Sequence, residues 1–246
     1  MSRFLELCEE VVGEAPDGVE AQALVRVTRK SLTRFANSFI HQNVAEDSSV
    51  LTLDLASEGR TARTATTLTD PASLGRLVGS ALSALELSPV DEDWTGFAPA
   101  SEIPDVGHHD PATASAEPEE RAAVVAEFIG AGSGLSAAGY CETEEEIVAV
   151  ANHRGLRYEG KATAAVLDGI HQTATSAGKA HRAGQSLASL DGRLAGEEAA
   201  RIARDSVDTV DIEPGRYEVV LRPNCVGTLG TFVGLYAFGG KAASEG

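Results

Sequence analysis

The chain of 246 residues is long enough to bury a large hydrophobic core, and its 43% hydrophobic content is typical of a globular protein. Its formal net charge of −17, from 20 basic and 37 acidic side chains, argues against nucleic acid and anionic membranes as partners, because Lys and Arg supply most of that affinity. The N-terminal stretch MSRFLELCEEVVGEA mixes acidic with apolar residues and lacks the apolar core of an export signal. Cys8, Cys141 and Cys225 form no CxxC pair, so we expect buried, reduced thiols and a cytoplasmic location.

The first part of the chain, residues 1–87, has the pattern of an α+β domain. Apolar residues recur at helical spacing near both ends and alternate between them, which favours helices around a set of strands. Asp70 followed by Pro71 suits a helix start, because Asp caps free N–H groups and Pro is tolerated in the first turn. We expect, in order, a helix at 3–14, strands at 19–30 and 31–45, a hairpin at 49–68 turning at 57–60, and a helix ending near 87.

Residues 88–116 are rich in Pro, Asp, Ser and Ala, a composition typical of a linker. The central part, residues 117–212, repeats the α+β pattern and predicts a second domain. Its expected elements are a helix at 117–131, a second antiparallel set at 135–180 with a hairpin turn at 152–155, a flexible basic segment TSAGKAHRAGQS, and a helix at 196–207.

The last part, residues 213–246, predicts a strand at 216–223 followed by a glycine-spaced apolar helix. So apolar a helix needs a further layer to cover it. We interpret this part as the incomplete start of a third, mainly β domain, with coverage by earlier strands as the alternative. The predicted fold class is therefore α+β, with antiparallel sheets and flanking helices in two consecutive domains.

The histidines and acidic residues do not form a recognisable catalytic or metal-binding pattern. No HExxH, HxH, GxSxG or phosphate-binding glycine loop occurs in the sequence. His108, His109 and Asp110 are the densest cluster, but neighbouring residues in a linker rarely face one ion. We expect a solvated strand end for the acidic run at 142–146. Surface positions are expected for His153 at a hairpin tip, His171 on a strand and His181 in the basic segment.

Four segments match one known family in order: TRFANSFIHQNVAED (33–47), SEGRTARTAT (57–66), EEIVAVANHRGLRYEGKAT (145–163) and VVLRPNCVGTLGTFVGLYAFGGKAASEG (219–246). They resemble the TldD/PmbA family, the modulators of DNA gyrase. The resemblance spans nearly the whole chain. It implies a cytoplasmic peptidase of two related subunits that enclose a cavity for unfolded or short peptides.

In the metal-bearing subunit of that family, a helix carries His-Glu-x-x-x-His, whose two His bind zinc while the Glu activates water. The motif aligns with residues 223–228, where Pro223, Asn224 and Thr228 replace His, Glu and His. The resemblance therefore implies the non-metallated PmbA or TldE type, without catalytic residues, metal or cofactor of its own. Zinc is expected in a TldD-type partner subunit.

The amino-terminal sheet of the family helps to line or close the assembly. Arg34, Asn37 and His41 are therefore candidates for peptide or partner contacts, and a solvent-facing sheet surface is the alternative. Two other interpretations stay open. One is a catalytically inert interaction module or truncated remnant, and the other is an active metallopeptidase with displaced ligands such as His108, His109 or Cys225.

Overall fold

The computed structural model describes residues 2–104 and 106–240. The chain divides into two compact units, Met1–Asp205 and Ser206–Gly246. The first unit contains all of the described β-strands, and α6 (Pro223–Ala237) is the regular element of the second. We describe each unit separately.

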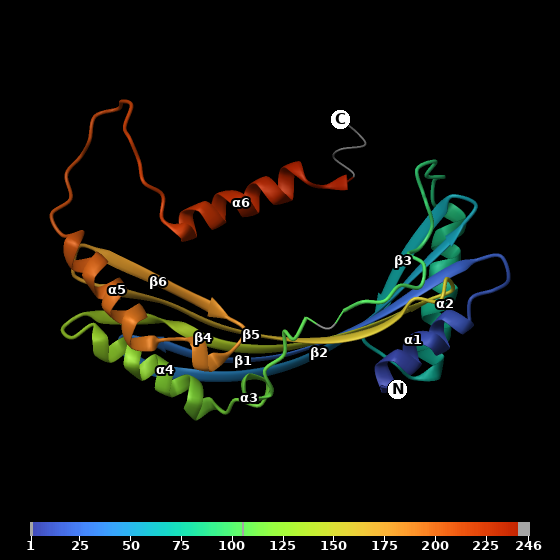
Figure 1. Ribbon diagram of the computed structural model, residues 1–246, viewed down its shortest axis with the longest axis horizontal. Coiled ribbons are helices and arrows are strands. Elements are labelled where there is room, and N and C mark those ends of the chain that lie inside the picture. Colours follow the sequence, from blue (N-terminus) through green and yellow to red (C-terminus); the bar gives the residue numbers. More distant parts are fainter. Residues whose placement is uncertain (1, 105, 241–246) are drawn as a thin grey trace. The chain divides into compact units, whose positions relative to one another are not determined.

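The first unit is an α+β structure, which confirms the predicted fold class (Figure 1). The helices predicted at 3–14, at 117–131 and from Pro71 to residue 87 are confirmed within one residue. Its elements are α1 (Arg3–Gly13), β1 (Glu20–Ala36), β2 (Phe39–Ser57), β3 (Arg60–Thr66), α2 (Pro71–Leu87), α3 (Pro111–Ala114), α4 (Pro118–Ala131), β4 (Ser136–Asn152), β5 (Arg157–Gln172), β6 (Ala177–Gly184), the short 3₁₀ turn η1 (Leu187–Ser189) and α5 (Gly192–Asp205).

The described strands form one six-stranded antiparallel sheet in the order β3-β2-β1-β4-β5-β6. Its central pair, β1 with β4, runs in register from Gln22 opposite Asn152 to Phe35 opposite Gly139. Strands from both sides of the 88–116 segment thus share one sheet. The division into consecutive domains at that segment stays a prediction.

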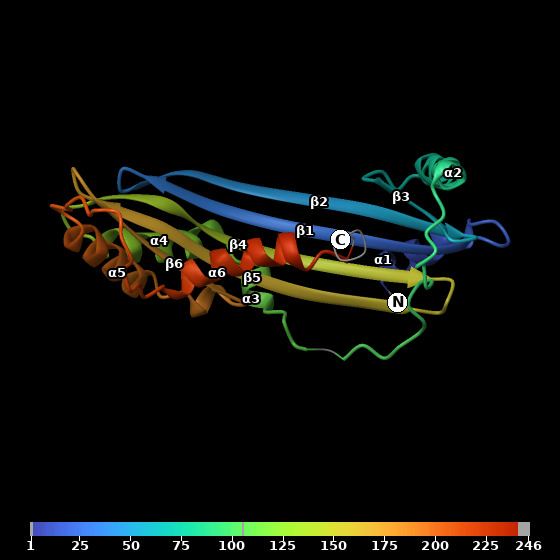
Figure 2. The ribbon, with the colours of Figure 1, turned by 90° about the horizontal axis from the view of Figure 1, so that it is seen from above.

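The two faces of this sheet differ in burial. Along β1 the odd-numbered residues Ala21, Ala23, Val25 and Val27 are buried, whereas their even-numbered neighbours are half-buried or exposed. Because side chains alternate between faces along a strand, one face carries the helices and the other does not. Figure 2 shows how the strands run side by side for most of their length.

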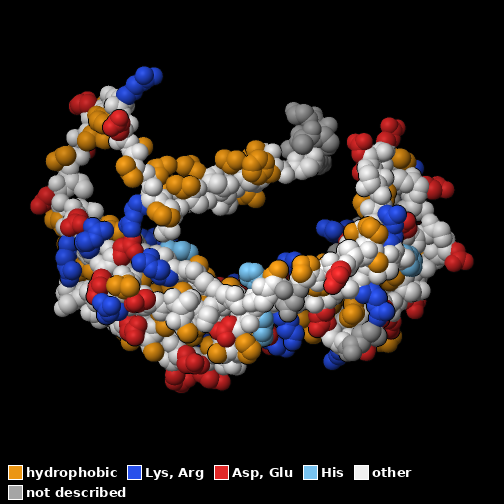
Figure 3. All heavy atoms as spheres, in the orientation of Figure 1, with side chains coloured by type: hydrophobic (Ala, Val, Ile, Leu, Met, Phe, Trp, Pro, Cys, Tyr) orange, Lys and Arg blue, Asp and Glu red, His pale blue; other side chains and the backbone are white. Residues whose placement is uncertain are grey.

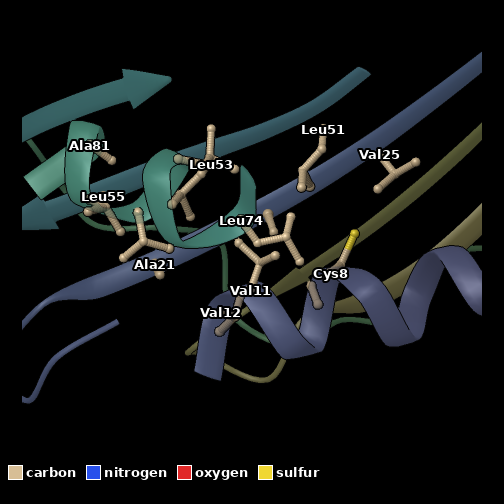
Figure 4. Close-up of a cluster of buried hydrophobic side chains, with 14 of the residues drawn as sticks. Cys8, Val11, Val12, Ala21, Val25, Leu51, Leu53, Leu55, Leu74 and Ala81 are labelled. Carbon is tan, nitrogen blue, oxygen red and sulfur yellow. The ribbon is translucent and has the colours of Figure 1, made fainter. Parts of the chain in front are cut away.

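Two hydrophobic clusters lie at opposite ends of the helix-bearing face. The first, which we call the aliphatic end, joins α1 and α2 to the sheet mainly through Leu and Val (Figure 4). The second, the glycine-packed end, joins α4 and α5 to the sheet around Phe35 and Phe128. Each buried aliphatic or aromatic side chain contributes roughly 1.5–3 kcal/mol relative to exposure. The two clusters therefore fix the sheet at both ends.

The hairpin turns confirm one predicted strand boundary and correct another. Glu58 and Gly59, with φ of 50° and 74°, form the predicted turn between β2 and β3. The turn between β1 and β2 lies at Asn37 and Ser38, with φ of 51° and 63°. The predicted break near residue 30 was wrong. No Gly or Pro marks the true turn, and Asn supplies the left-handed backbone instead.

Two further predictions in the central part need correction. The segment expected to be flexible and basic contains β6, which pairs with β5 from Gln172 opposite Ala177 to Ala165 opposite Gly184. Its Gly178 and Ala180 side faces α5, and small residues there let the helix approach closely. Helix α5 also begins at Gly192, four residues before the predicted start.

In the second unit, residues 206–222 contain neither helix nor strand in the part of the chain that the structure describes. The strand predicted at 216–223 is therefore not formed, since a strand needs a paired neighbour. The apolar helix is present as α6, and Figure 3 shows hydrophobic side chains gathered along it. None of its residues is buried. None of the described helices is long and apolar enough to span a membrane.

Candidate binding surface

The sheet face of the first unit that carries no helices presents polar side chains from neighbouring strands. We call it the open face. Register places even-numbered residues of β1, β2, β4 and β5 on it, together with odd-numbered residues of β3 and β6. Its charged residues on paired strands, together with His181, are Glu20, Arg26, Lys30, Arg34, Glu46, Asp54, Arg63, Glu142, Glu144, Glu146, Asp168 and Lys179.

Most cations of the open face are paired across strands. Lys30 Nζ lies 3.1 Å from a Glu142 carboxylate oxygen and 3.0 Å from one of Glu144. Hydrogen bonds to Glu144 and then Glu142 raise the pKa of Lys30 above its ordinary value. Arg26 Nε lies 3.6 Å from Glu146. These pairs lower the negative charge in the middle of the surface, where Glu46, Glu142, Glu144 and Glu146 still outnumber the two cations.

Both ends of the open face carry a similar pair. Arg63 donates to both carboxylate oxygens of Asp54, at 2.5 and 3.1 Å. At the other end, Asp168 lies 3.0 Å from Lys179 Nζ and 2.9 Å from His181 Nδ1. His181 therefore lies on a strand beside a carboxylate, whereas the sequence predicted a flexible segment.

Arg34, Asn37 and His41 lie in one hairpin, at the end of β1 and the start of β2, and all three are exposed. Arg34 is on the open face and has no ion-pair partner within residues 2–104 and 106–240. Asn37 is a turn residue. His41 occupies a β-bulge, since the register shifts there, and its ring lies edge-on to Phe39 at 6.2 Å. Their role in binding stays a prediction.

Sequence patterns missed a charge cluster around the buried Glu145 on the helix-bearing face. Glu145 accepts a hydrogen bond from Arg29 Nη1 at 2.8 Å, and its other oxygen lies 2.9 Å from His109 Nε2. Burial would raise the pKa of Glu145, but the hydrogen bonds from His109 and Arg29 outweigh it and lower the pKa. The prediction of a solvated strand end was therefore wrong, because residues 142–146 lie in the middle of β4 and Glu145 is buried.

The histidines do not gather into a metal site. Among the described residues, no group of three or more His, Cys, Asp or Glu side chains is placed to hold a metal ion. His153 is at the predicted hairpin tip, where Nδ1 accepts a hydrogen bond from the Ala21 N–H at 3.1 Å. A surface position for His171 was wrong, because this residue is fully buried.

His171 is held by the glycine-packed end. Its ring stacks on Phe128 at 4.8 Å, and Nε2 donates a hydrogen bond to the Phe128 carbonyl oxygen at 3.0 Å. Gly132 permits this approach, since a Cβ there would lie 2.0 Å from the ring. Burial lowers the pKa of His171 below its ordinary value, so the ring is neutral in the folded protein.

The cysteines differ in exposure. Cys8 and Cys141 are buried as predicted, and burial raises their pKa to about 11 and about 12. Both thiols are therefore protonated and unreactive at neutral pH. Cys225 lies exposed on α6, so a buried position for this third cysteine was wrong.

The residues aligned with the metal motif lie in the first turns of α6. Pro223 is the first helical residue, and Asn224 follows it. Thr228 Oγ1 donates to the Asn224 carbonyl oxygen at 3.0 Å, so this hydroxyl serves the helix itself. The three positions offer no imidazole and no carboxylate.

Comparison with known proteins shows likeness in structure. No protein-family model and no curated protein matches the sequence. A solved structure described as a proposed modulator of a DNA gyrase from Thermotoga maritima is 17% identical, with a TM-score of 0.74 over 86% of this chain and 50% of that one. A similarly described protein from Bacteroides thetaiotaomicron is 15% identical, with a TM-score of 0.77 over 86% and 52%. TldE from Thermococcus kodakarensis is 15% identical, with a TM-score of 0.67 over 81% and 46%.

These likenesses establish a shared fold. They confirm the fold that the sequence resemblance implied, because TldE and two gyrase modulators are the structures matched. The chain spans about half the length of each matched structure. The activity and partners of the whole proteins are therefore a matter for proposal.

Proposed function

We propose that this chain is the non-metallated subunit of a TldD/PmbA-type metallopeptidase, acting in the cytoplasm with a zinc-bearing partner. The fold shared with TldE and two gyrase modulators over at least 81% of the chain supports this assignment. The observation that carries the subunit type is the replacement of His, Glu and His by Pro223, Asn224 and Thr228.

The donor set at these positions does not fit zinc. Zinc in proteins is bound by imidazole, thiolate or carboxylate groups, usually four in structural sites and three in catalytic ones. Proline offers no side-chain donor, and an amide and a hydroxyl are weak substitutes. The chain's own residues would instead bind and orient peptide.

The open face supplies the chemistry for peptide contact in this proposal. Its strands present alternating polar side chains, and Lys30 and Arg26 offset part of the charge of their carboxylate partners. Arg34 is the exposed guanidinium near the hairpin, and it can pair with a peptide carboxylate. His41 adds a polar ring beside it, on the adjacent strand.

Activity through displaced ligands gains no support from the described residues. His109 is engaged by Glu145, and the His108 carbonyl oxygen accepts a hydrogen bond from Thr163 N–H at 2.8 Å. No grouping of three ligand side chains occurs between residues 2 and 240, residue 105 aside. The alternative is an interaction module without a role in proteolysis, and the experiment below distinguishes it from a peptidase subunit.

The proposal is tested by reconstitution. The purified chain is assayed for zinc by mass spectrometry and for cleavage of a disordered protein such as casein, alone and with a TldD-type subunit that carries the metal motif. We expect no stoichiometric zinc and no cleavage by the chain alone, and cleavage with the partner that is lost when the partner's motif Glu is changed to Gln. Zinc-dependent cleavage by the chain alone contradicts the proposal. So does a partner whose activity is unaffected by this chain.

The candidate contacts are tested in the same assay. We expect Arg34→Ala with His41→Ala to raise KM for peptide severalfold at nearly unchanged kcat, since these residues would add uniform binding. Arg193→Ala is a matched control, because Arg193 is an exposed arginine on α5 that pairs with Glu197. Equal effects of the two changes remove Arg34 and His41 from the proposal.

A further inference from the structure

The outer strands of the sheet leave two stretches of edge without a strand partner among the described residues. β3 pairs only with residues 51–57 of β2, so residues 39–50 of β2 have β1 on one side alone. β6 pairs only with residues 165–172 of β5, so residues 157–164 have β4 on one side alone. An unpaired edge presents N–H and C=O groups that can bind another chain.

The chain itself covers the β5 edge at Thr163. Thr163 N–H donates to the His108 carbonyl oxygen at 2.8 Å, and Asp110 N–H donates to Thr163 Oγ1 at 2.9 Å. Gln185 Nε2 donates to the Gly107 carbonyl oxygen at 2.9 Å and so fixes the same segment. Residues 107–110 therefore protect this edge around Thr163.

The β2 edge has no such cover. Within residues 39–50, every residue is exposed except Ile40 and Ser49, which are half-buried. No backbone hydrogen bond from a described segment other than β1 reaches these residues. Figure 2 shows β2 along the margin of the sheet, with β3 beside one end only.

Register identifies the free groups on this edge. The residues that flank a two-residue turn exchange both hydrogen bonds, so Ser57 and Arg60 do so across the turn from β2 to β3. Alternation then directs the backbone groups of odd-numbered β2 residues toward the β3 side. In the part of β2 that β3 does not reach, the backbone N–H and C=O groups of the odd-numbered residues point to the open edge. These residues are Asn43, Ala45, Asp47 and Ser49.

The side chains along this edge define the partner's chemistry. Glu46 and Asp47 are exposed and form no ion pair within the described ranges. Val44 and Val50 are 40% and 36% exposed on the open face, on either side of Glu46. A net charge of −17 opposes pairing with a second copy of the chain. An extended segment with basic residues among apolar ones is complementary to this strand.

We propose that residues 41–50 of β2 are a docking site for an extended basic segment of another polypeptide, which adds a strand to the sheet. Backbone hydrogen bonds to the odd-numbered residues supply affinity. Glu46, Asp47 and the two valines select the side chains. The proposal concerns one strand edge and does not depend on the peptidase assignment.

The probe for the test is a fluorescein-labelled ten-residue peptide of alternating Lys and Val, with Thr replacing some Val for solubility. A second probe has the same sequence with alternate amides N-methylated, which keeps the charge but removes backbone donors on one edge. Fluorescence anisotropy measures binding to the full chain. The N-methylated probe is made in two forms, one methylated at the odd-numbered amides and one at the even-numbered amides. We expect the unmethylated probe to bind, and at least one of the two methylated forms to bind about tenfold or more weakly.

The key variant is Ala45→Pro, which removes an outward N–H without breaking the ladder to β1, as edge strands allow. Ala65→Pro is the matched control, since Ala65 is an exposed alanine on the outer side of β3. Circular dichroism confirms that both variants fold. We expect about tenfold weaker binding for Ala45→Pro and less than twofold change for Ala65→Pro, with Glu46→Lys also weakening binding.

Three results overturn the proposal. Equal binding of all N-methylated and unmethylated peptides indicates charge attraction without strand pairing. Unchanged affinity of Ala45→Pro shows that the edge is not used. Sedimentation can also reveal dimers that form with increasing protein concentration. If Ala45→Pro abolishes these dimers and the peptide does not affect them, the edge binds a second copy of the chain. Because this test needs neither zinc nor cleavage, its failure is distinguishable from failure of the proposed function.

Discussion

The aliphatic and glycine-packed ends hold the same sheet by different means. At the aliphatic end, Leu51, Leu53 and Leu55 of β2 belong to one buried cluster with residues of α1 and α2, part of which Figure 4 shows. At the glycine-packed end, glycine residues contribute to packing because the absence of a side chain lets the helix approach the sheet closely. A Cβ on Gly178 would lie 2.0 Å from the Ala199 carbonyl oxygen of α5. One end is stabilised by burying volume, and the other by close backbone approach.

The largest effect is expected from emptying the aliphatic end. Leu53 is fully buried, so Leu53→Ala should lower the free energy of unfolding by about 2–5 kcal/mol, through lost transfer energy and a cavity. Urea denaturation followed by circular dichroism measures the change. Leu87→Ala is the control, because Leu87 is 87% exposed, and it should change stability by less than about 0.5 kcal/mol. A loss below about 1 kcal/mol for Leu53→Ala would show that this end is not packed as described.

The opposite change tests the glycine-packed end. Gly178→Ala adds a methyl group against the backbone of α5 and should destabilise by about 1–3 kcal/mol. Gly79→Ala is the matched control, since nothing lies within 4 Å of a Cβ there and α2 gains helix propensity. That control should be neutral or stabilising by up to about 1 kcal/mol. Both values come from the same urea titrations, and equal effects would erase the distinction between the ends.

The pH dependence sharpens the comparison, because only the glycine-packed end buries a histidine. The pKa of His171 is lowered from 6.5 by burial, so the unfolded chain binds a proton there before the folded protein does. His171 therefore favours the folded state fully above about pH 6.5 and progressively less as pH falls below it, by up to about 1.4 kcal/mol per pH unit. We expect His171→Gln to flatten the stability curve below about pH 6.5.

The smallest effect concerns the two hairpins. In the hairpin turn near the aliphatic end, Glu58 has a φ of 50°. In the turn near the glycine-packed end, Asn37 has a φ of 51°. Asn tolerates this backbone better than Glu, so Glu58→Asn should stabilise by a few tenths of a kcal/mol, about 0.5 at most. Glu92→Asn removes the same charge from an exposed loop position and is the control. Thermal unfolding compares the two, and a destabilised Glu58→Asn variant would contradict the turn assignment.

The sequence alone determined most elements at the aliphatic end. Alternating Leu51, Leu53 and Leu55, the Glu58-Gly59 turn and the Asp70-Pro71 helix start are local signals, each decided by side-chain periodicity or backbone preference over a few residues. The resemblance to TldD/PmbA proteins likewise came from local motifs, and it led to the fold that the matched structures share.

Only the tertiary structure decided the glycine-packed end and the interior charges. The small residues of β6 gave no strand signal, because their value lies in the approach of α5, which no local window contains. Glu145 meets Arg29 and His109 through pairing of β1 with β4 and the path of the 106–110 segment. The sequence also does not predict the open edge of β2. It depends on how far a neighbouring strand extends, and long-range pairing sets that limit.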